Sequence, residues 1–350
     1  MAEKETIAEA VSWYSKERPV YHKLSKKVES IIEEIINDQN VAIHAIYSRA
    51  KDIDSFAKKL EDPKYTNPKT DITDLAGIRV ISYVESDLEN ISKLIEANFD
   101  IDKENSIDKS ETLGEDKVGY RSIHFIAKLP NDRLKLPEYK KYSGIFFEIQ
   151  IRTILQHAWA EIEHDKNYKF SGVLPIKLKR RFKILAGLLE LADREFNEIA
   201  SEIDKYSASV KADTKKGKLD IPIDSTSIKL YLKEKFKDLI KQGMNPEFAS
   251  ENSEKLVLDE LREFKITTLK ELDNIIPIDY CDRAIKYRQS EVNYTGLVRH
   301  LMIVNDADKY FRDSWKNHWK NFNSNVMEIL RSYNPKIEEV FKNHNIKTIQ

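Results

Sequence analysis

One predicted strand, in the segment FFEIQIRT, carries a row of polar side chains. Glu148, Gln150 and Arg152 alternate there with aromatic and aliphatic residues, so one face of the strand is polar and the other apolar. A polar face is unusual on a strand between helical layers, and it indicates the wall of a polar cleft. A carboxylate in such a cleft can hold a metal ion or accept a proton.

A second segment, SRAKDIDSFAKK, offers cations that suit phosphate groups. Ser55 and Lys59 lie four residues apart and share a helix face, while Arg49 and Lys51 alternate on the strand before it. An ordinary solvated basic helix explains the same pattern. The spacing therefore makes these four residues candidates for phosphate binding.

Two further segments place polar groups on predicted strands. In TDLAGIRVI, Asp74 directly precedes a buried strand that contains Arg79, and a buried arginine needs either a structural ion pair or a ligand. In VGYRSIHF, alternation puts Tyr120, Ser122 and His124 on one face. The tyrosine ring is either a stacking surface for a base or part of the core.

The helix HAWAEIEHDKNYK places His157, Glu161 and His164 at intervals of about one turn. This spacing is compatible with a metal site, but the helix lacks the HExxH motif, and a solvated face explains it equally. The chain also contains neither GxxxxGK[ST] nor GxGxxG, so side chains must hold any phosphate.

The bulk composition narrows the class of protein. The 58 basic and 59 acidic residues give a formal net charge of -1, so the chain has no global attraction to nucleic acid or membrane. The single cysteine, Cys281, cannot form a disulfide within the chain, and with His300 it is too little for a zinc site. No run of about 18 apolar residues exists. We expect a cytoplasmic protein without a membrane span.

These residues must be positioned by a mixed sheet with helices around it. Four short runs rich in β-branched and aromatic residues alternate with helical segments around 52–61 and 86–97, which predicts an α+β fold. Residues 2–38 predict one or two helices broken near Pro19, and 177–203 predict a long helix packed on the sheet. We expect a helical layer at 1–40, the sheet domain at 41–206, a linker at 207–227 and a mainly helical domain at 228–350.

Two other patterns leave alternatives open. The run KLKRRFK at 177–183 is either a site for a phosphate-rich partner such as RNA or a solvated basic turn. Near the C-terminus, Trp315, Trp319 and Phe322 form an aromatic stripe at helical spacing, which belongs either to the core or to a partner surface.

Taken in order, DLAGIRVI, GYRSIH and EIQIRT followed by HAWAEIEHDxxYK resemble the synthetase domain of the RelA/SpoT family and its small alarmone synthetases. The resemblance covers residues 44–169. It implies a nucleotidyltransferase-like synthetase fold and the Mg²⁺-dependent transfer of pyrophosphate from ATP to a ribose 3′-hydroxyl. The family's hydrolase domain needs well over a hundred residues, and only about 40 precede the synthetase region here, so we expect no alarmone hydrolase activity.

The resemblance also implies a role for each matching residue. Arg49 and Arg79 match two arginines that sandwich the ATP adenine, and Lys51, Ser55 and Lys59 match the residues that hold its phosphates. Asp74 and Glu148 match the two carboxylates that bind Mg²⁺. The side chains that match acceptor contacts are Tyr120, His124, Gln150 and His157. Glu148 is in addition the candidate general base.

The acceptor is the open point. Val118 and His157 stand where many relatives have asparagines, and the segment 100–117, which we expect to be a loop, has seven acidic residues against three basic ones. Our leading hypothesis is a GDP or GTP pyrophosphokinase that makes (p)ppGpp-type alarmones and AMP. The alternatives are a toxin that pyrophosphorylates the 3′-CCA end of tRNA and is restrained by its C-terminal domain, and an inactive nucleotide-binding sensor. A protein trigger or inhibitor at the C-terminal domain and a homo-oligomer are further expected partners.

Overall fold

The computed structural model describes residues 7–39, 41–108, 122–169, 175–287, 292–315, 322 and 324–346. The chain divides into two compact units, Met1–Ser201 and Glu202–Gln350. Each unit has its own cluster of buried apolar side chains. None of the described helices is long and apolar enough to cross a membrane.

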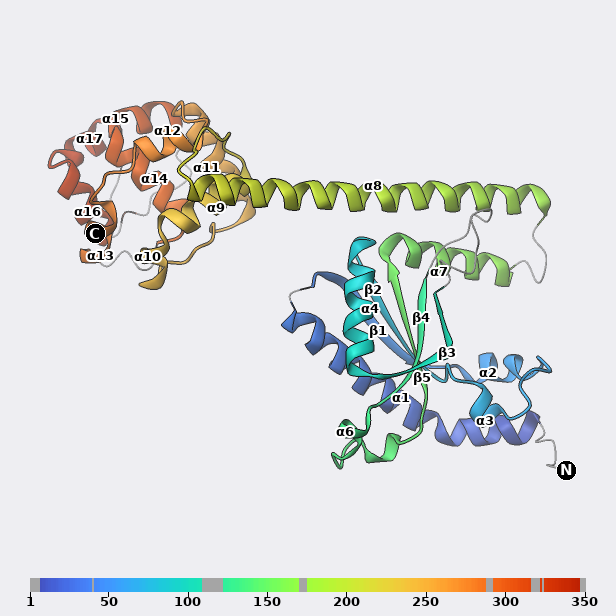
Figure 1. The fold of residues 1–350 in the computed structure, drawn as a ribbon. Helices are drawn as coiled ribbons and strands as arrows, with labels where there is room; N and C mark the ends of the chain where they lie inside the picture. The colour runs from blue at the N-terminus through green and yellow to red at the C-terminus, as the bar shows by residue number, and fades with distance from the viewer. Residues whose placement is uncertain are drawn as a thin grey trace. The chain divides into compact units, whose positions relative to one another are not determined.

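Unit 1 is built on a five-stranded mixed sheet of order β1-β2-β5-β4-β3 (Figure 1). The strands are β1 (Ile43–Ala50), β2 (Ala76–Ser82), β3 (Asp100–Asp108), β4 (Ile123–Lys128) and β5 (Phe147–Thr153). The central pair β2 and β5 is parallel, and the other three pairs are antiparallel. The predicted mixed sheet is therefore confirmed.

Strand β3 is the one element of the sheet that we did not predict. Its sequence DIDKENSID is mostly polar, and we expected residues 100–117 to form a loop. The strand pairs only with β4 and lies at the edge of the sheet, where charged residues are common and an apolar face is not required. Residues 109–117 of the expected loop lie outside the described residues.

The helices of unit 1 are α1 (Ile7–Asp38), α2 (Ile53–Lys59), α3 (Pro68–Asp71), α4 (Ser86–Asn98), α6 (Asn131–Leu134), α7 (Ile154–Lys169) and the first part of α8 (Ile176–Lys215). Helix α1 continues through Pro19, so the expected break near this residue is wrong. Tertiary contacts hold the helix on the N-terminal side of the proline, because Tyr14 and Arg18 both donate hydrogen bonds to the Lys51 carbonyl. Tyr21 and Leu24 are buried on the other side.

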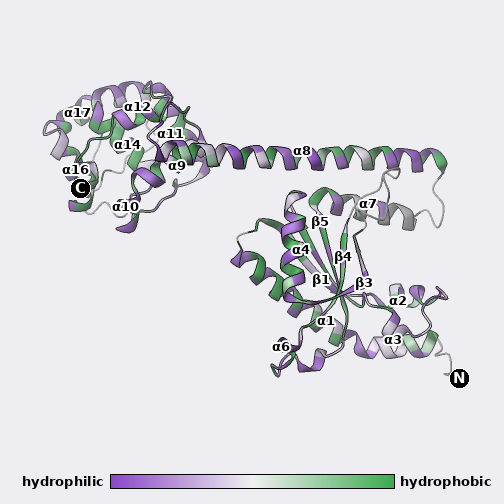
Figure 2. Cartoon of the chain, viewed as in Figure 1, coloured by the Kyte–Doolittle hydropathy of each residue, from purple (hydrophilic) through white to green (hydrophobic). Residues whose placement is uncertain are grey.

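The long helix predicted from residue 177 exists as α8, but it packs on the rest of unit 1 along a narrow face. Thr153 donates a hydrogen bond to the buried Asp193, and the Ser86 amide donates one to Asn197. Hydrophobic and hydrophilic residues alternate along the ribbon of this helix (Figure 2). Much of its apolar face stays exposed in this structure, namely Ile184, Leu185, Leu188, Leu191, Phe196 and Ile199. The helix continues to Lys215, so residues 207–215 of the predicted linker are helical.

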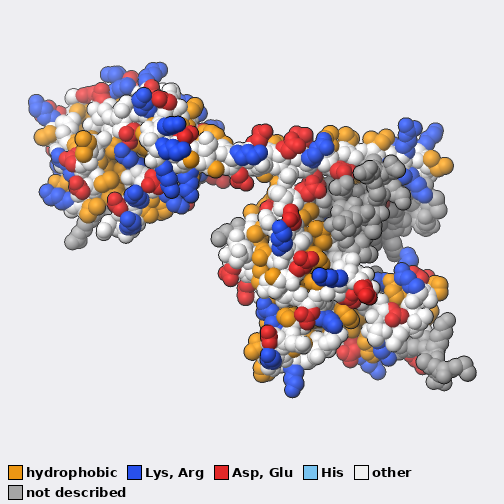
Figure 3. All heavy atoms as spheres, viewed as in Figure 1, with side chains coloured by type: hydrophobic (Ala, Val, Ile, Leu, Met, Phe, Trp, Pro, Cys, Tyr) orange, Lys and Arg blue, Asp and Glu red, His pale blue; other side chains and the backbone are white. Residues whose placement is uncertain are grey.

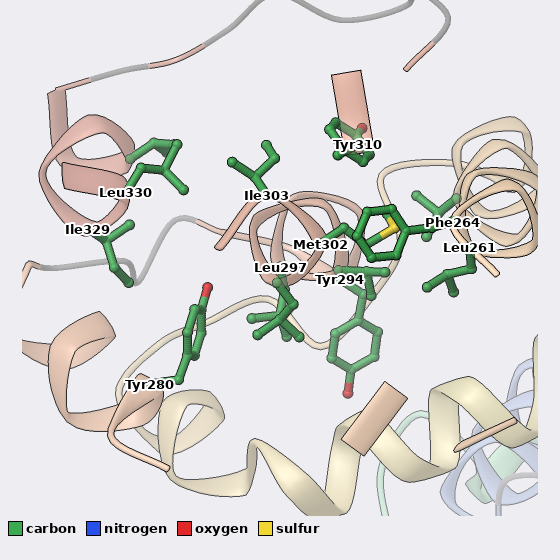
Figure 4. Close-up of a cluster of buried hydrophobic side chains, with 14 of the residues drawn as sticks. Leu261, Phe264, Tyr280, Tyr294, Leu297, Met302, Ile303, Tyr310, Ile329 and Leu330 are labelled. Atoms are coloured by element: carbon green, nitrogen blue, oxygen red, sulfur yellow. The ribbon is translucent and has the colours of Figure 1, made fainter. Parts of the chain in front are cut away.

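Unit 2 is mainly helical, as predicted. Its helices are α9 (Ser225–Lys235), α10 (Lys237–Lys241), α11 (Glu251–Glu263), α12 (Leu269–Asn274), α13 (Tyr280–Lys286), α14 (Tyr294–Asn305), α15 (Ala307–Lys309), α16 (Ser324–Tyr333) and α17 (Ile337–Asn343). Their apolar faces converge on α14, where nine of the twelve residues are buried (Figure 4). Capping boxes at Asp224 and Thr268 begin α9 and α12.

The aromatic stripe near the C-terminus contributes to this core. Phe322 is fully buried, and the ring of Trp315 packs against Phe311 at 5.6 Å between centroids. Trp319 lies outside the described residues. For the two residues that the structure describes, the core interpretation is the better one.

Candidate active site

The polar face of β5 meets two neighbouring strands that carry the predicted donor-side residues. In the parallel pair, Glu148 lies opposite Gly77 and Gln150 opposite Arg79. In the antiparallel pair of β1 and β2, Arg49 lies opposite the same Gly77. Because directly opposed residues in a sheet point to the same face, one side of the sheet collects Arg49, Arg79, Glu148 and Gln150.

A cavity of about 190 Å³ opens over this face. It is lined by Tyr47, Ser48, Arg49, Lys51, Asp74, Gly77, Ile78, Arg79, Glu148 and Gln150. Six of these residues are candidates from the sequence, and they come from three strands and two connecting segments. Ser55 is exposed on α2 and is not among the lining residues.

Asp74 is the centre of a charge cluster at one end of the cavity. Its Oδ2 accepts hydrogen bonds from Lys51 Nζ at 2.7 Å and from Lys59 Nζ at 2.8 Å. Burial by itself would raise the pKa of Asp74, but the two ammonium groups outweigh it and the net pKa is lowered. The other oxygen, Oδ1, is buried and has no hydrogen-bond partner among the described residues. An ionised carboxylate with one unused oxygen can accept a further ligand.

Glu148 lies in a chain of hydrogen bonds across β4 and β5. His124 Nδ1 contacts Glu148 Oε1 at 2.8 Å, and Gln150 Nε2 donates to Oε2 at 2.7 Å. On the far side of the imidazole, Ser122 Oγ lies 2.8 Å from His124 Nε2. Burial alone would raise the pKa of Glu148, yet the bonds from His124 and Gln150 leave it lowered. The carboxylate is therefore ionised at neutral pH and oriented by two donors.

Helix α7 places two more candidates against the same face. Glu161 forms an ion pair with Arg79 at 2.5 Å, which supplies the partner that this strand arginine requires. His157, one turn earlier, lies beside Tyr47 of β1, with ring centroids 6.2 Å apart. Burial lowers the pKa of His157, so its ring is neutral at physiological pH.

Several predictions lie partly or wholly outside the described residues. Tyr120, and with it Val118, falls in the undescribed segment 109–121, and the side chain of His164 is also undescribed. The possible metal spacing on α7 therefore stays a prediction, and in this structure its Glu161 is paired with Arg79. Within the described part of the chain, no group of three or more His, Cys, Asp and Glu side chains is placed to hold a metal ion.

Tyr47 and Gly77 line the cavity although we did not select them from the sequence. Tyr47 precedes Arg49 by two positions on β1, so the alternation that selects Arg49 also brings Tyr47 to the same face. Gly77 lies between Arg49 and Glu148 in the sheet, and a Cβ added to it would meet no atom within 4 Å. The missing side chain leaves the floor of the cavity open.

Residues 48–173 match the family model described as a region found in RelA/SpoT proteins. The chain is 31% identical over 161 residues to the GTP pyrophosphokinase YwaC of Bacillus subtilis (strain 168), and the match covers 45% of this chain and 73% of YwaC. The chain belongs to the RelA/SpoT family. The resemblance seen in the sequence is thus confirmed, and the matched region contains every candidate site residue of the synthetase domain.

A second curated relative and a solved structure are also similar to this chain. The GTP pyrophosphokinase YjbM of the same organism is 29% identical over 174 residues, covering 49% of this chain and 79% of YjbM. Among solved structures, the small alarmone synthetase 1 from Bacillus subtilis shares 25% identity with a TM-score of 0.47, covering 55% of this chain and 98% of that one. The residues matched by the family model, 48–173, lie within unit 1.

Proposed function

We propose that this protein transfers the β,γ-pyrophosphate of ATP to the ribose 3′-hydroxyl of GDP or GTP, giving (p)ppGpp-type alarmones and AMP. The observation that carries the proposal is the shared cavity, which holds two carboxylates, Asp74 and Glu148, beside the cations of Arg49, Lys51 and Arg79. Pyrophosphoryl transfer needs cations for the phosphates and a group that can take the acceptor's proton. The names of the relatives YwaC and YjbM support the same reaction.

On the donor side, Arg49 and Arg79 supply planar guanidinium groups for the adenine ring. Lys51 and Lys59 hold their ammonium groups within 3 Å of Asp74, where they can exchange part of that contact for phosphate oxygens. Ser55, exposed on the helix that carries Lys59, remains a proposed phosphate ligand. The cluster therefore offers a binding site for the triphosphate of ATP next to the two arginines proposed to hold its adenine.

Asp74 and Glu148 also suit a magnesium ion. Both line the cavity, the Asp74 charge acts on Glu148, and Asp74 Oδ1 is buried without a partner. Hard oxygen ligands of this kind are those that Mg²⁺ prefers, with phosphate oxygens completing the set. When bound, the ion would neutralise negative charge on the phosphates of ATP.

On the acceptor side, Glu148 would take the proton of the 3′-hydroxyl as its oxygen attacks the β-phosphorus of ATP and AMP leaves. Its lowered pKa keeps it ionised, and His124 and Gln150 fix the direction of both carboxylate oxygens. Gln150 Oε1 is buried without a partner among the described residues and can accept a hydrogen bond from the acceptor. We propose Tyr120 as the stacking surface for the acceptor's base, as the family resemblance implies.

A second candidate acceptor, the 3′ end of tRNA, is favoured by one observation. The cations of KLKRRFK are exposed at the beginning of α8, where Lys and Arg side chains gather on the surface (Figure 3). Such a cluster attracts a polyphosphate chain more strongly than it attracts a single nucleotide. Unit 2 would then be the candidate for restraining the toxin.

The two candidates are separated by incubating the full chain with γ-labelled ATP and with GDP, GTP or deacylated tRNA. We expect label on the guanine nucleotide, and Glu148→Gln is the inactive control. Label found only on the 3′ end of tRNA would exclude the proposed acceptor and support the toxin. In that event Arg180→Glu with Arg181→Glu should reduce labelling of tRNA, because both cations are exposed. Nucleotide binding without any transfer would identify an inactive sensor.

A further inference from the structure

Tyr47 is an aromatic residue at the edge of the proposed donor site, and the family resemblance gives it no role. Its side chain lines the cavity and is 52% exposed, which is high for a large side chain on a paired strand. It lies directly opposite Arg79 in the β1–β2 register and two residues before Arg49 on the same strand face. Tyr47 is therefore a neighbour of both arginines proposed to hold the adenine.

Helix α7 covers this position with His157. The Tyr47 and His157 rings are 6.2 Å apart with an angle of 31° between their planes, a tilted arrangement. His157 Nδ1 is buried and has no hydrogen-bond partner among the described residues. One turn further along α7, Glu161 holds the guanidinium of Arg79. Contacts of α7 with β2 and β5 keep this end of the helix against the sheet (Figure 1).

We propose that Tyr47 and His157 form an aromatic pair that contacts the adenine of the donor nucleotide and contributes to its selection. The inference rests on the proposed function. It moves His157 from the acceptor side, where the family resemblance puts it, to the donor side. The ring of His157 packs against Tyr47, and the charges that act on it come from Glu161, Arg79, Arg152 and His44. These groups lie on β1, β2, β5 and α7. On the proposed acceptor side, His124 and Glu148 bond to each other.

The physical reason is the match between the surface and the ligand. A neutral imidazole and a phenol ring present flat, uncharged faces, which stack on a base and carry no positive charge for a phosphate. The unpaired His157 Nδ1 adds one polar contact to the edge of the base. Arg49 and Arg79 alone would stack on any planar base. The pair of Tyr47 and His157 beside them would favour the base whose shape and polar edge it fits.

Binding to the full chain tests the proposal without requiring turnover. Isothermal titration would compare a non-hydrolysable ATP analogue, tripolyphosphate and GDP. For Tyr47→Leu we expect about a tenfold higher Kd for the ATP analogue, because one stacking contact of typical strength is lost. The Kd for tripolyphosphate, which has no base, and that for GDP should stay within about twofold. Tyr47→Phe keeps the ring and should bind like the unchanged protein.

The chain offers a matched control in Tyr83. This tyrosine follows β2, is 49% exposed, and also packs against a histidine, His44, at 5.8 Å between ring centroids. It does not line the cavity, so Tyr83→Leu should leave all three dissociation constants unchanged. His157→Leu should weaken binding of the ATP analogue, and adding it to Tyr47→Leu should cost less than the product of the two single effects.

The outcomes distinguish the inference from the function on which it rests. If the unchanged protein binds neither the ATP analogue nor GDP, the proposed function fails. If it binds both and Tyr47→Leu has no effect on the ATP analogue, the aromatic pair has no role and the inference is overturned. An equal loss for tripolyphosphate, or a loss confined to GDP, also overturns it, since the first means general damage to the cavity and the second an acceptor role.

Discussion

The substitution Gly77→Val tests whether the reaction takes place in the cavity, because it should reduce activity without lowering the stability of the sheet. Gly77 lies between Arg49 and Glu148 in the sheet, and a Cβ at this position would meet no atom within 4 Å. The side chain of valine would therefore enter the cavity of about 190 Å³ and not the core. The change fills the space between the proposed donor site and the proposed general base.

The expected effects on stability and activity have opposite signs. A glycine inside a strand lowers stability by roughly 0.5–1 kcal/mol relative to alanine, and valine favours strands, so the free energy of unfolding should stay equal or rise by up to about 1 kcal/mol. A substrate displaced by about 1 Å loses on the order of 100-fold in rate. We expect kcat/KM to fall by about that factor for Gly77→Val and by less for Gly77→Ala.

Urea unfolding and the labelled-ATP transfer assay measure the two quantities on the same preparation. Titration with a non-hydrolysable ATP analogue shows whether binding or only transfer is lost. The reasoning is refuted if Gly77→Val retains activity within about twofold, because the cavity floor would then not be part of the site. It is also refuted if the variant is less stable than the unchanged protein, because the side chain would then meet atoms that the structure places elsewhere.

Three further predictions concern single ionisable groups. Glu148→Gln should lower the transfer rate by about 10²–10⁴ while the urea midpoint stays unchanged, and a variant with normal turnover would remove Glu148 as the base. In unit 2, Glu260 accepts hydrogen bonds from Arg299 and Tyr310 and is nearly fully buried. Glu260→Ala should therefore cost about 3–5 kcal/mol in urea unfolding, because it removes the carboxylate that pairs with the buried Arg299 guanidinium; a loss below about 1 kcal/mol would contradict this. Burial and the Arg299 charge lower the pKa of His300 to about 4, so the unfolded chain takes up this proton first as pH falls below about 6.5. The contribution of His300 to unfolding free energy should drop by about 2 kcal/mol between pH 7 and pH 5, and His300→Gln should abolish that part of the pH dependence.

The sequence by itself determined the local features of the site. Alternation along a strand is a property of neighbouring residues, so the polar face of Glu148 and Gln150 could be predicted before the strand's partners were known. The same holds for most elements of the sheet and for the family, whose motifs lie in short continuous segments. The polar edge strand β3 escaped because an edge position imposes no apolar pattern.

Only the tertiary structure decided which of these faces meet. Strand β5 inserts between β2 and β4, and this order, not any local pattern, puts Glu148 beside Gly77 and within reach of His124. Arg79 finds its partner Glu161 at a separation of 82 residues, which no spacing rule indicates. Likewise, the periodicity of α8 predicts an apolar face but does not show whether another element covers it. An amphipathic pattern depends on the sequence of the helix alone, whereas burial of its apolar face depends on which element packs against it.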